Sequence, residues 1–221
     1  MRYLFILILL LTLGWNWDSH KGFIESSFKE FPDDLRAKLS LPLMQDGSMV
    51  PDRDFKDFTN HSYPRSIKSI NYWFNISKEA FLKGDYQKAS TTFGIASHYI
   101  SDSLAAPHSV SGEDYKDHKL YEDQADFEFN VRCKSINLEE ELQNYSKSKK
   151  LEWEEWLNSK SSKFPKSSSK EAANVVFSAA LNLFDVKCEN VIKEEKKFNW
   201  YWLILILVII LIIYLFYRKY F

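Results

Sequence analysis

Apolar side chains recur at intervals of three and four residues along most of the chain, which is the spacing of one face of an α-helix. One series runs over residues 67–81 and stops before Gly84. A second runs over residues 86–104 and stops before Pro107. The same spacing predicts helices over residues 20–30, 116–129, 138–157 and 168–190, and a short helix after Pro32. No sustained alternation of apolar and polar residues appears, so the predicted fold class is all-α.

Two internal stretches lack this spacing. Residues 45–59 contain Gly47, Pro51 and four aspartates, and they predict a loop. Residues 159–169 are rich in serine and lysine, and they predict a polar linker within the domain.

The N-terminus is apolar from Leu4 to Leu13, directly after a basic residue, Arg2. About ten apolar residues are too few to cross about 30 Å of hydrocarbon as a helix. The pattern predicts a signal peptide over residues 1–14, cleaved between Gly14 and Trp15. The alternative is an N-terminal anchor that is not cleaved.

The C-terminus is apolar over a longer stretch, and residues 199–217 predict a transmembrane helix. Aromatic residues lie at both of its ends, as they do at membrane interfaces. Residues 218–221 would form a short cytoplasmic tail, and the alternative is a helix buried in the protein core. We expect one domain, residues 15–198, held at the cell membrane by a single-pass anchor with the domain on the extracytoplasmic side.

The charge and cysteine content exclude several classes of site. The 29 basic and 30 acidic side chains give a net charge of −1, which provides no overall positive field for nucleic acid. Two cysteines cannot form a Cys₄ zinc finger unaided. In an oxidising compartment, a disulfide between Cys133 and Cys188 is expected in place of two free thiols.

All five histidines stand in patterns typical of metal ligands. Within predicted helices, His98 precedes Asp102 by four residues and His118 precedes Glu122 by four, so each pair shares one helix face. His108 follows the turn between these helices. His61 follows the aspartate-rich loop that contains Asp52, and His20 lies five residues after Trp15. A single pair of this kind is more often a surface contact, but the recurrence at every histidine indicates a metal site.

These residues also resemble a known family. The run from Phe93 through His98-Tyr99 to Asp102, followed by Pro107-His108, is similar to the core motif of the zinc-dependent phospholipase C family, which is related to the S1/P1 nucleases. His118 with Glu122, Asp52 with His61, and Trp15 with His20 resemble the other family elements. The resemblance extends from Trp15 to about Glu122.

The resemblance implies an all-α fold with three zinc ions. One ion would be held by Asp52, His61, His98 and Asp102. A second would be held by His108, His118 and Glu122. The third would be held by the free amino group and carbonyl of Trp15, by His20 and by Asp102 as a bridge. Signal cleavage would then be needed to complete the third site.

The implied activity is hydrolysis of phospholipids, with Asp52 either as the general base or as a ligand only. Asp18, Phe58 and Arg53 occupy the positions that bind the headgroup in the family. The first two suit a cationic headgroup, whereas Arg53 does not suit choline. The glutamate at residue 122 resembles the phospholipase branch. The alternatives are a single-strand nuclease of the S1/P1 type and a non-catalytic zinc-binding surface protein.

Overall fold

The computed structural model describes residues 17–191, and all the regular structure in that range is helical. The predicted all-α class is therefore confirmed for this part of the chain. The α-helices are α1 (Trp17–Lys29), α2 (Asp33–Arg36), α3 (Leu41–Gly47), α4 (Ser66–Leu82), α5 (Tyr86–Asp102), α6 (Tyr115–Asp123), α7 (Leu138–Ser159) and α8 (Lys163–Leu183). Three short helices of other types are η1 (Pro51–Phe55), η2 (Ala106–Ser109) and η3 (Cys188–Asn190).

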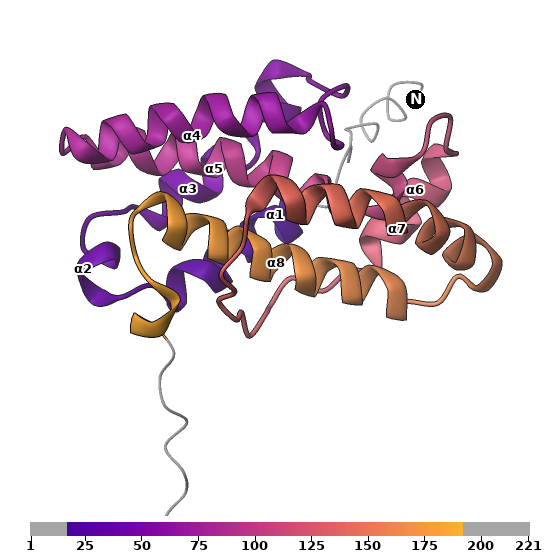
Figure 1. Ribbon diagram of the computed structural model, residues 1–221. Helices are drawn as coiled ribbons and strands as arrows, with labels where there is room; N and C mark the ends of the chain where they lie inside the picture. The colour runs from indigo at the N-terminus through magenta and orange to yellow at the C-terminus, as the bar shows by residue number, and fades with distance from the viewer. Residues whose placement is uncertain (1–16, 192–221) are drawn as a thin grey trace, which may run out of the picture. The chain divides into compact units, whose positions relative to one another are not determined.

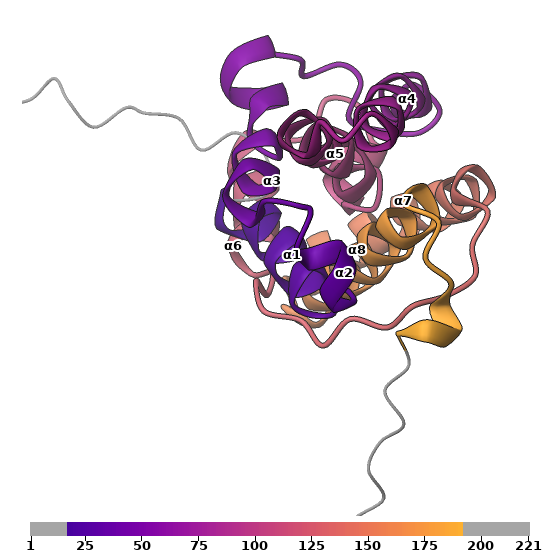
Figure 2. The ribbon, with the colours of Figure 1, turned by 90° about the vertical axis from the view of Figure 1, so that its left-hand side faces the viewer.

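Helix α5 forms the centre of the domain, with α3, α4, α1 and α8 packed around it (Figures 1 and 2). It begins where the Asp85 carboxylate accepts a hydrogen bond from the backbone N–H of Lys88. Every residue from Thr92 to Asp102 is buried. A helix that is buried on all sides brings polar side chains into the core along with apolar ones, and α5 carries His98 and Asp102 there.

Close contact between α3 and α5 depends on two glycines. A Cβ atom added at Gly94 would lie 2.1 Å from the carbonyl oxygen of Met44, and one added at Gly47 would lie 2.2 Å from the carbonyl oxygen of Thr91. The two backbones therefore meet without side chains between them. This approach brings the carbonyl of Ser48, the residue after α3, to the ring of His98.

The loop predicted over residues 45–59 is wrong in part. Helix α3 extends through Gly47, and residues 51–55 form a π-helical turn with Pro51 in its first turn, where the missing N–H leaves no hydrogen bond unmade. The sequence pattern did not indicate α3 because the helix is short, contains a proline and ends on a glycine.

The linker predicted over residues 159–169 is also wrong, because α8 begins at Lys163. Pro165 lies in the first turn of α8, where backbone N–H groups have no helical partner. Ser168 and Ser169 are buried, and Ser169 Oγ donates to the carbonyl of Lys166. The helix ends at Leu183, so the prediction for residues 168–190 was too long by one to two turns at its C-terminal end.

The helix predicted over residues 116–129 ends early, at Asp123, and the chain then runs extended to Asn137. Phe129, Val131 and Cys133 pack against the core at a spacing of two residues. Backbone N–H groups in this segment donate to side chains on α1 and α8. Phe129 donates to Ser26 Oγ at 3.1 Å, and Lys134 donates to Ser178 Oγ at 3.0 Å.

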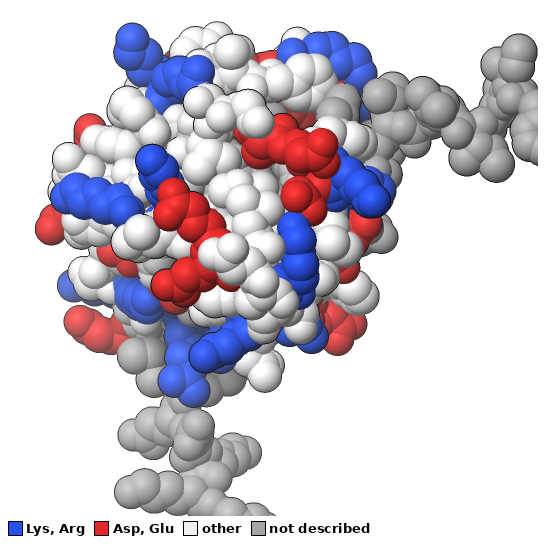
Figure 3. Space-filling model, turned by 90° about the vertical axis from the view of Figure 1, so that its right-hand side faces the viewer, with Lys and Arg blue, Asp and Glu red and all other residues white. Residues whose placement is uncertain are grey.

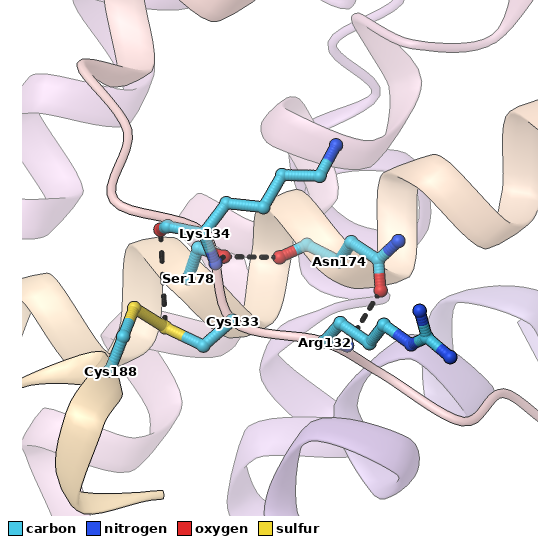
Figure 4. Close-up of a disulfide and its surroundings, with 6 residues drawn as sticks. All are labelled: Arg132, Cys133, Lys134, Asn174, Ser178 and Cys188. Atoms are coloured by element: carbon cyan, nitrogen blue, oxygen red, sulfur yellow. Dashed lines mark hydrogen bonds between the residues drawn. A yellow bond between two sulfur atoms is a disulfide. The ribbon is translucent and has the colours of Figure 1, made fainter. Parts of the chain in front are cut away.

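Cys133 and Cys188 form a disulfide with a Cα–Cα distance of 5.5 Å (Figure 4). It joins the extended segment to the residues that follow α8. Beside it, the backbone N–H of Arg132 donates to Asn174 Oδ1 at 2.8 Å, so the segment is fixed to α8 on both sides of the disulfide.

In residues 17–191, no helix is both long enough and apolar enough to cross a membrane. The predicted signal peptide (residues 1–14), transmembrane helix (199–217) and C-terminal tail (218–221) lie outside the residues that the structure describes, and so do the first and last residues of the predicted domain. These assignments stay predictions.

Replacing Gly94 by alanine tests the contact between α3 and α5. Because the new Cβ would meet backbone atoms that cannot rotate away, we expect the free energy of unfolding to fall by about 2 kcal/mol. Urea unfolding of the zinc-free protein measures this change. The control is Gln87→Ala at an exposed position of the same helix, which should alter stability by less than about 0.5 kcal/mol. Equal effects of the two substitutions would contradict the close-contact argument.

Candidate metal centre

Five imidazoles from five parts of the chain converge near the C-terminal end of α5. His20 comes from α1, His61 from the segment between η1 and α4, His98 from α5, His108 from η2 and His118 from α6. Three carboxylates, from Asp52, Asp102 and Glu122, lie among them. All these side chains are buried except those of His108 and His118, which are 11 % and 14 % exposed. The side of the cluster formed by α6 is therefore the side open to solvent.

Asp102 is at the centre of the cluster and is fully buried. One of its oxygens, Oδ2, lies 3.0 Å from His61 Nδ1, 3.2 Å from His98 Nε2 and 3.8 Å from His108 Nε2. The other, Oδ1, lies 3.4 Å from His20 Nε2. A single carboxylate thus faces four imidazoles, which is the arrangement of a bridging ligand between ions.

Asp52 adds a second buried carboxylate. Its Oδ1 lies 3.4 Å from His98 Nε2 and 3.5 Å from His61 Nε2. On the α6 side, Glu122 Oε1 lies 2.8 Å from His118 Nε2 and 3.5 Å from His108 Nε2. Each carboxylate is close enough to two imidazoles for all three groups to bind one cation.

Hydrogen bonds from the protein fix which ring nitrogen of each histidine faces the cluster. His98 Nδ1 donates to the carbonyl of Ser48 at 2.8 Å, which leaves Nε2 as the lone-pair nitrogen. Ser101 Oγ donates to the carbonyl of His98, so its oxygen accepts from His20 Nδ1 at 3.1 Å. His20 Nε2 is then also free of a proton and faces Asp102.

His118 is oriented by a carboxylate that the sequence analysis did not select. Its Nδ1 lies 3.2 Å from Glu113 Oε1, while its Nε2 faces Glu122. A carboxylate on the far nitrogen is the usual second partner of a metal-binding histidine. Ser48 and Ser101 have the same role and were missed as well. Of these, only Ser101 lies inside the sequence motif.

The buried ligand atoms of the cluster lack hydrogen-bond partners, as expected for atoms that bind cations. Among the described side chains, eight buried polar atoms have no hydrogen-bond partner, and all eight lie in this cluster. They are His20 Nε2, both oxygens of Asp52, His61 Nε2, His98 Nε2, both oxygens of Asp102 and His108 Nε2. Leaving one buried polar group unpaired costs about 1–3 kcal/mol, so a cluster of eight indicates atoms that bind something other than protein.

The pKa values of three histidines in the cluster are shifted by burial and by the neighbouring carboxylates. Burial lowers the pKa of His20 to about 3, and the neighbouring imidazole of His98 acts in the same direction. Burial also acts against protonation of His98, but the carboxylates of Asp102 and Asp52 outweigh it and raise the pKa of His98 to about 10. Burial likewise opposes a charge on His118, whose pKa is raised to about 9 by Glu122 and Glu113.

The structure brings together the residues of the predicted ligand sets that it describes. Asp52, His61 and His98 form one group, His108, His118 and Glu122 a second, and His20, His98 and Asp102 a third. A fourth group, His61, Asp102 and His108, connects the first two. In each group, the candidate ligand atoms lie within 4.8 Å of one another. Trp15 lies outside the described residues, so the amino-terminal ligand stays a prediction.

Two of the predicted headgroup residues differ in their surroundings. Phe58 is 52 % exposed, and its ring lies 6.4 Å from that of His61, edge to face, so it borders the cluster. Arg53 is held by two carboxylates, with Nη1 2.6 Å from Asp46 Oδ1 and Nη2 2.8 Å from Asp54 Oδ2. Its charge is thus balanced within the protein. Asp18 lies in the first turn of α1, and its side chain is outside what the structure describes.

The segment that carries Phe58 and His61 is organised by Asp57. This carboxylate accepts hydrogen bonds from the backbone N–H groups of Thr59 and Asn60, from Asn60 Nδ2 and from the hydroxyl of Tyr99 on α5. The Tyr99 hydroxyl to Asp57 Oδ2 distance is 3.0 Å. Tyr99, the residue after His98 in the motif, therefore fixes the segment that delivers His61.

A second polar network holds α6 in place. The hydroxyl of Tyr121, next to the ligand Glu122, donates to Glu152 Oε1 on α7 at 2.5 Å. The same carboxylate accepts from Ser168 Oγ on α8 and, through Oε2, from the buried Lys149 ammonium at 2.7 Å. Tyr121 and Glu122 are the buried residues of this short polar helix, and the Tyr121 ring also packs against Trp153 and Trp156, so the contact with Glu152 is one of several that position α6.

The side of the molecule that carries α6 and the C-terminal end of α7 is shown in Figure 3. Uncharged surface covers much of the described part of this face. Acidic side chains gather near its middle, and most Lys and Arg side chains lie closer to its edge. On the described residues of this face there is therefore no continuous basic groove of the kind that binds a nucleic-acid backbone.

A family model described as zinc-dependent phospholipase C matches residues 19–171. The match includes every residue of the cluster described above and ends within α8. No individually curated protein matches the sequence.

Zinc binding should release protons from the cluster. At pH 7 the zinc-free protein holds a proton on His98 and on His118, because both pKa values lie above 7, whereas His20 is neutral. Zinc requires unprotonated nitrogen, so we expect about two protons to be released per chain at pH 7 and fewer as the pH approaches 10. Calorimetric titration in buffers of different ionisation enthalpy measures this number. Zinc binding without proton release at pH 7 would contradict these protonation states.

Replacing Glu152 by glutamine tests the network beneath α6. The neutral side chain cannot satisfy Lys149 and Tyr121 together, so we expect zinc affinity at the His108, His118 and Glu122 group to fall roughly 10- to 100-fold. The other groups should bind as before. Titration against a competing chelator measures the affinities, and Glu154→Gln, at an exposed position of α7, is the matched control. An equal loss at every group would indicate general unfolding instead.

Proposed function

This chain belongs to the zinc-dependent phospholipase C family, whose members are phosphoric diester hydrolases, and from that membership we propose a membrane-anchored, extracytoplasmic enzyme that cleaves phospholipids at a centre of three zinc ions. The products would be diacylglycerol, or its equivalent, and a phosphorylated headgroup. The observation that carries the proposal is the set of eight buried, unpartnered ligand atoms, all of which lie in one cluster of imidazoles and carboxylates.

The distances within the cluster support the ligand sets that the family resemblance implies. We propose that Asp52, His61, His98 and Asp102 hold the first ion, and that His108, His118 and Glu122 hold the second. His20 and Asp102 would hold the third together with the amino group and carbonyl of Trp15. Bound zinc supplies positive charge that polarises a phosphodiester and activates water toward it. With neutral imidazoles the three carboxylates carry a charge of −3, so several divalent ions are needed to reach a positive site.

Asp52 is the candidate base. Its Oδ1 faces two imidazoles, whereas Oδ2 is buried with no partner among the described residues. We propose that Oδ1 is the ligand atom and that Oδ2 takes the proton from the attacking water. The hydrogen bonds that His98 and His20 donate to Ser48 and Ser101 keep both rings oriented, so the ligand atoms need not rearrange when the substrate binds.

Phe58 and Asp18 are the residues that we propose contact the headgroup. Phe58 borders the cluster and offers an aromatic face to a cation, and Asp18 would add a carboxylate. Since Arg53 is already paired with Asp46 and Asp54, we propose that it shapes the segment between α3 and α4 and does not contact the headgroup directly.

The test compares lipid and nucleic acid on the same preparation. The chain that begins at Trp15 after signal cleavage, in detergent, should contain three zinc ions by mass spectrometry and should cleave phospholipid and not single-stranded DNA. His98→Ala should lower lipid cleavage roughly 1000-fold, because it removes a ligand that faces both Asp52 and Asp102. Asp52→Asn separates the two roles of Asp52, since loss of turnover with three ions retained indicates the base.

The control for these variants is Asp123→Asn, an exposed carboxylate in α6 that pairs with Lys119. It should retain zinc and activity. Cleavage of DNA alone would support a nuclease, and fewer than two ions would contradict both enzymes. A chain that keeps residues 1–14 should bind one ion fewer, since an amide nitrogen at Trp15 cannot act as an amine ligand.

A further inference from the structure

Exposed aromatic side chains gather on η1 and the first half of α4. Phe55 is 46 % exposed and Tyr72 is 60 % exposed, and Trp73 lies beside both. We call these three residues the aromatic ledge. Single exposed apolar side chains are ordinary on a protein surface, but a cluster of large rings indicates a surface that binds something.

The three rings of the ledge contact one another, one pair nearly parallel and the other edge to face. The rings of Phe55 and Trp73 lie 5.7 Å apart and nearly parallel, at 12°. The ring of Tyr72 meets that of Trp73 edge to face at 5.0 Å. Their mutual contacts hold the rings in fixed positions although solvent reaches them, so a partner would find this surface already formed.

Two lysines flank the ledge. Lys56 directly follows Phe55 in a left-handed conformation, and Lys68 lies one helical turn before Tyr72 on the same face of α4. Both lysines are exposed. Of the acidic neighbours, Asp54 pairs with Arg53, and Asp57 keeps its charge while accepting hydrogen bonds from Asn60 and Tyr99.

The ledge is also continuous with the metal centre. Phe55 and the buried ligand Asp52 belong to the same helical turn, η1. The chain then leads through Phe58, whose ring meets that of His61, to the start of α4. One short segment therefore connects the ledge to two ligands of the cluster, Asp52 and His61.

We propose that the aromatic ledge, together with Lys56 and Lys68, lies against a phospholipid bilayer and holds the metal centre at its surface. The inference rests on the proposed function, because a phospholipid presents its phosphodiester to the enzyme while its acyl chains stay in the membrane. Rings with a polar edge, such as Tyr72 and Trp73, suit the boundary between headgroups and acyl chains. Lysines beside them suit the phosphates.

The kinetic test uses Phe55→Ser with Tyr72→Ser in the full chain. We expect cleavage of bilayer lipid to fall roughly tenfold, because less apolar surface enters the interface. Cleavage of a short-chain phospholipid that dissolves as single molecules should change less than twofold. Leu82→Ser is the matched control, since Leu82 is 74 % exposed at the opposite end of α4. It should leave both activities unchanged.

A second measurement reports contact directly and needs no turnover. The full chain is reconstituted in vesicles that contain brominated phospholipid, which quenches the fluorescence of nearby tryptophans. Trp73→Phe should remove part of the quenched signal, whereas quenching of the other tryptophans, measured in that variant, should be unchanged.

The outcomes separate this inference from the proposed function. Wild-type protein that cleaves neither lipid would contradict the proposed function, and the quenching of Trp73 would still test the ledge. Equal losses on bilayer and dissolved lipid would overturn the ledge proposal, as would unquenched Trp73. Loss of dimers in the Ser variants, with bilayer cleavage unchanged, would overturn it as well and assign the surface to a second copy of the chain.

Discussion

The domain depends on the burial of Asp102 among histidines. This carboxylate is fully enclosed at the C-terminal end of the central helix, and among the described residues its charged neighbours are imidazoles and not Lys or Arg side chains. Imidazoles balance such a charge only when they are protonated; burial prevents this at His20, whose pKa is lowered, whereas Asp102 and Asp52 raise the pKa of His98. Divalent cations remove the conflict, because they compensate the carboxylates while every imidazole stays neutral.

The arrangement of the helices around α5 brings these ligands to one point. The ligand-bearing end of α5 has small residues at Gly94, Ala96 and Ser97, which let neighbouring helices approach. Helix α3 then supplies the Ser48 carbonyl, while α1 supplies His20 and is connected to α5 through Ser101. Helix α6 has little apolar surface of its own and is held by Glu152, Lys149 and Ser168. Polar contacts therefore help to hold the helices in position around the metal centre, in addition to the apolar packing of the core.

The sequence predicted the long helices and the cluster well, for a physical reason. Helical spacing is local, and a His–carboxylate pair four residues apart has its geometry fixed by one helix, as with His98 and Asp102. The extended segment over residues 124–137 was not predicted because tertiary contacts with Ser26, Asn174 and Ser178 satisfy its backbone. Glu113 and Glu152 could not be selected either, since each acts on a ligand through space and neither has a distinctive spacing from it.

The disulfide has a mechanical consequence. Cys188 lies three residues before Val191, the last residue described, and its partner Cys133 lies 55 residues earlier, before α7. A pulling force applied to the chain beyond Val191 would reach the domain first at this covalent bond. It would pass to the segment that is hydrogen-bonded along α8, and the hairpin of α7 and α8 would lie inside a closed loop that bears no tension. From Cys133 this segment leads back to α6 and its two ligands, so the hydrogen bonds to Asn174 and Ser26 lie on the path between the disulfide and the metal centre and would resist strain before it reaches α6.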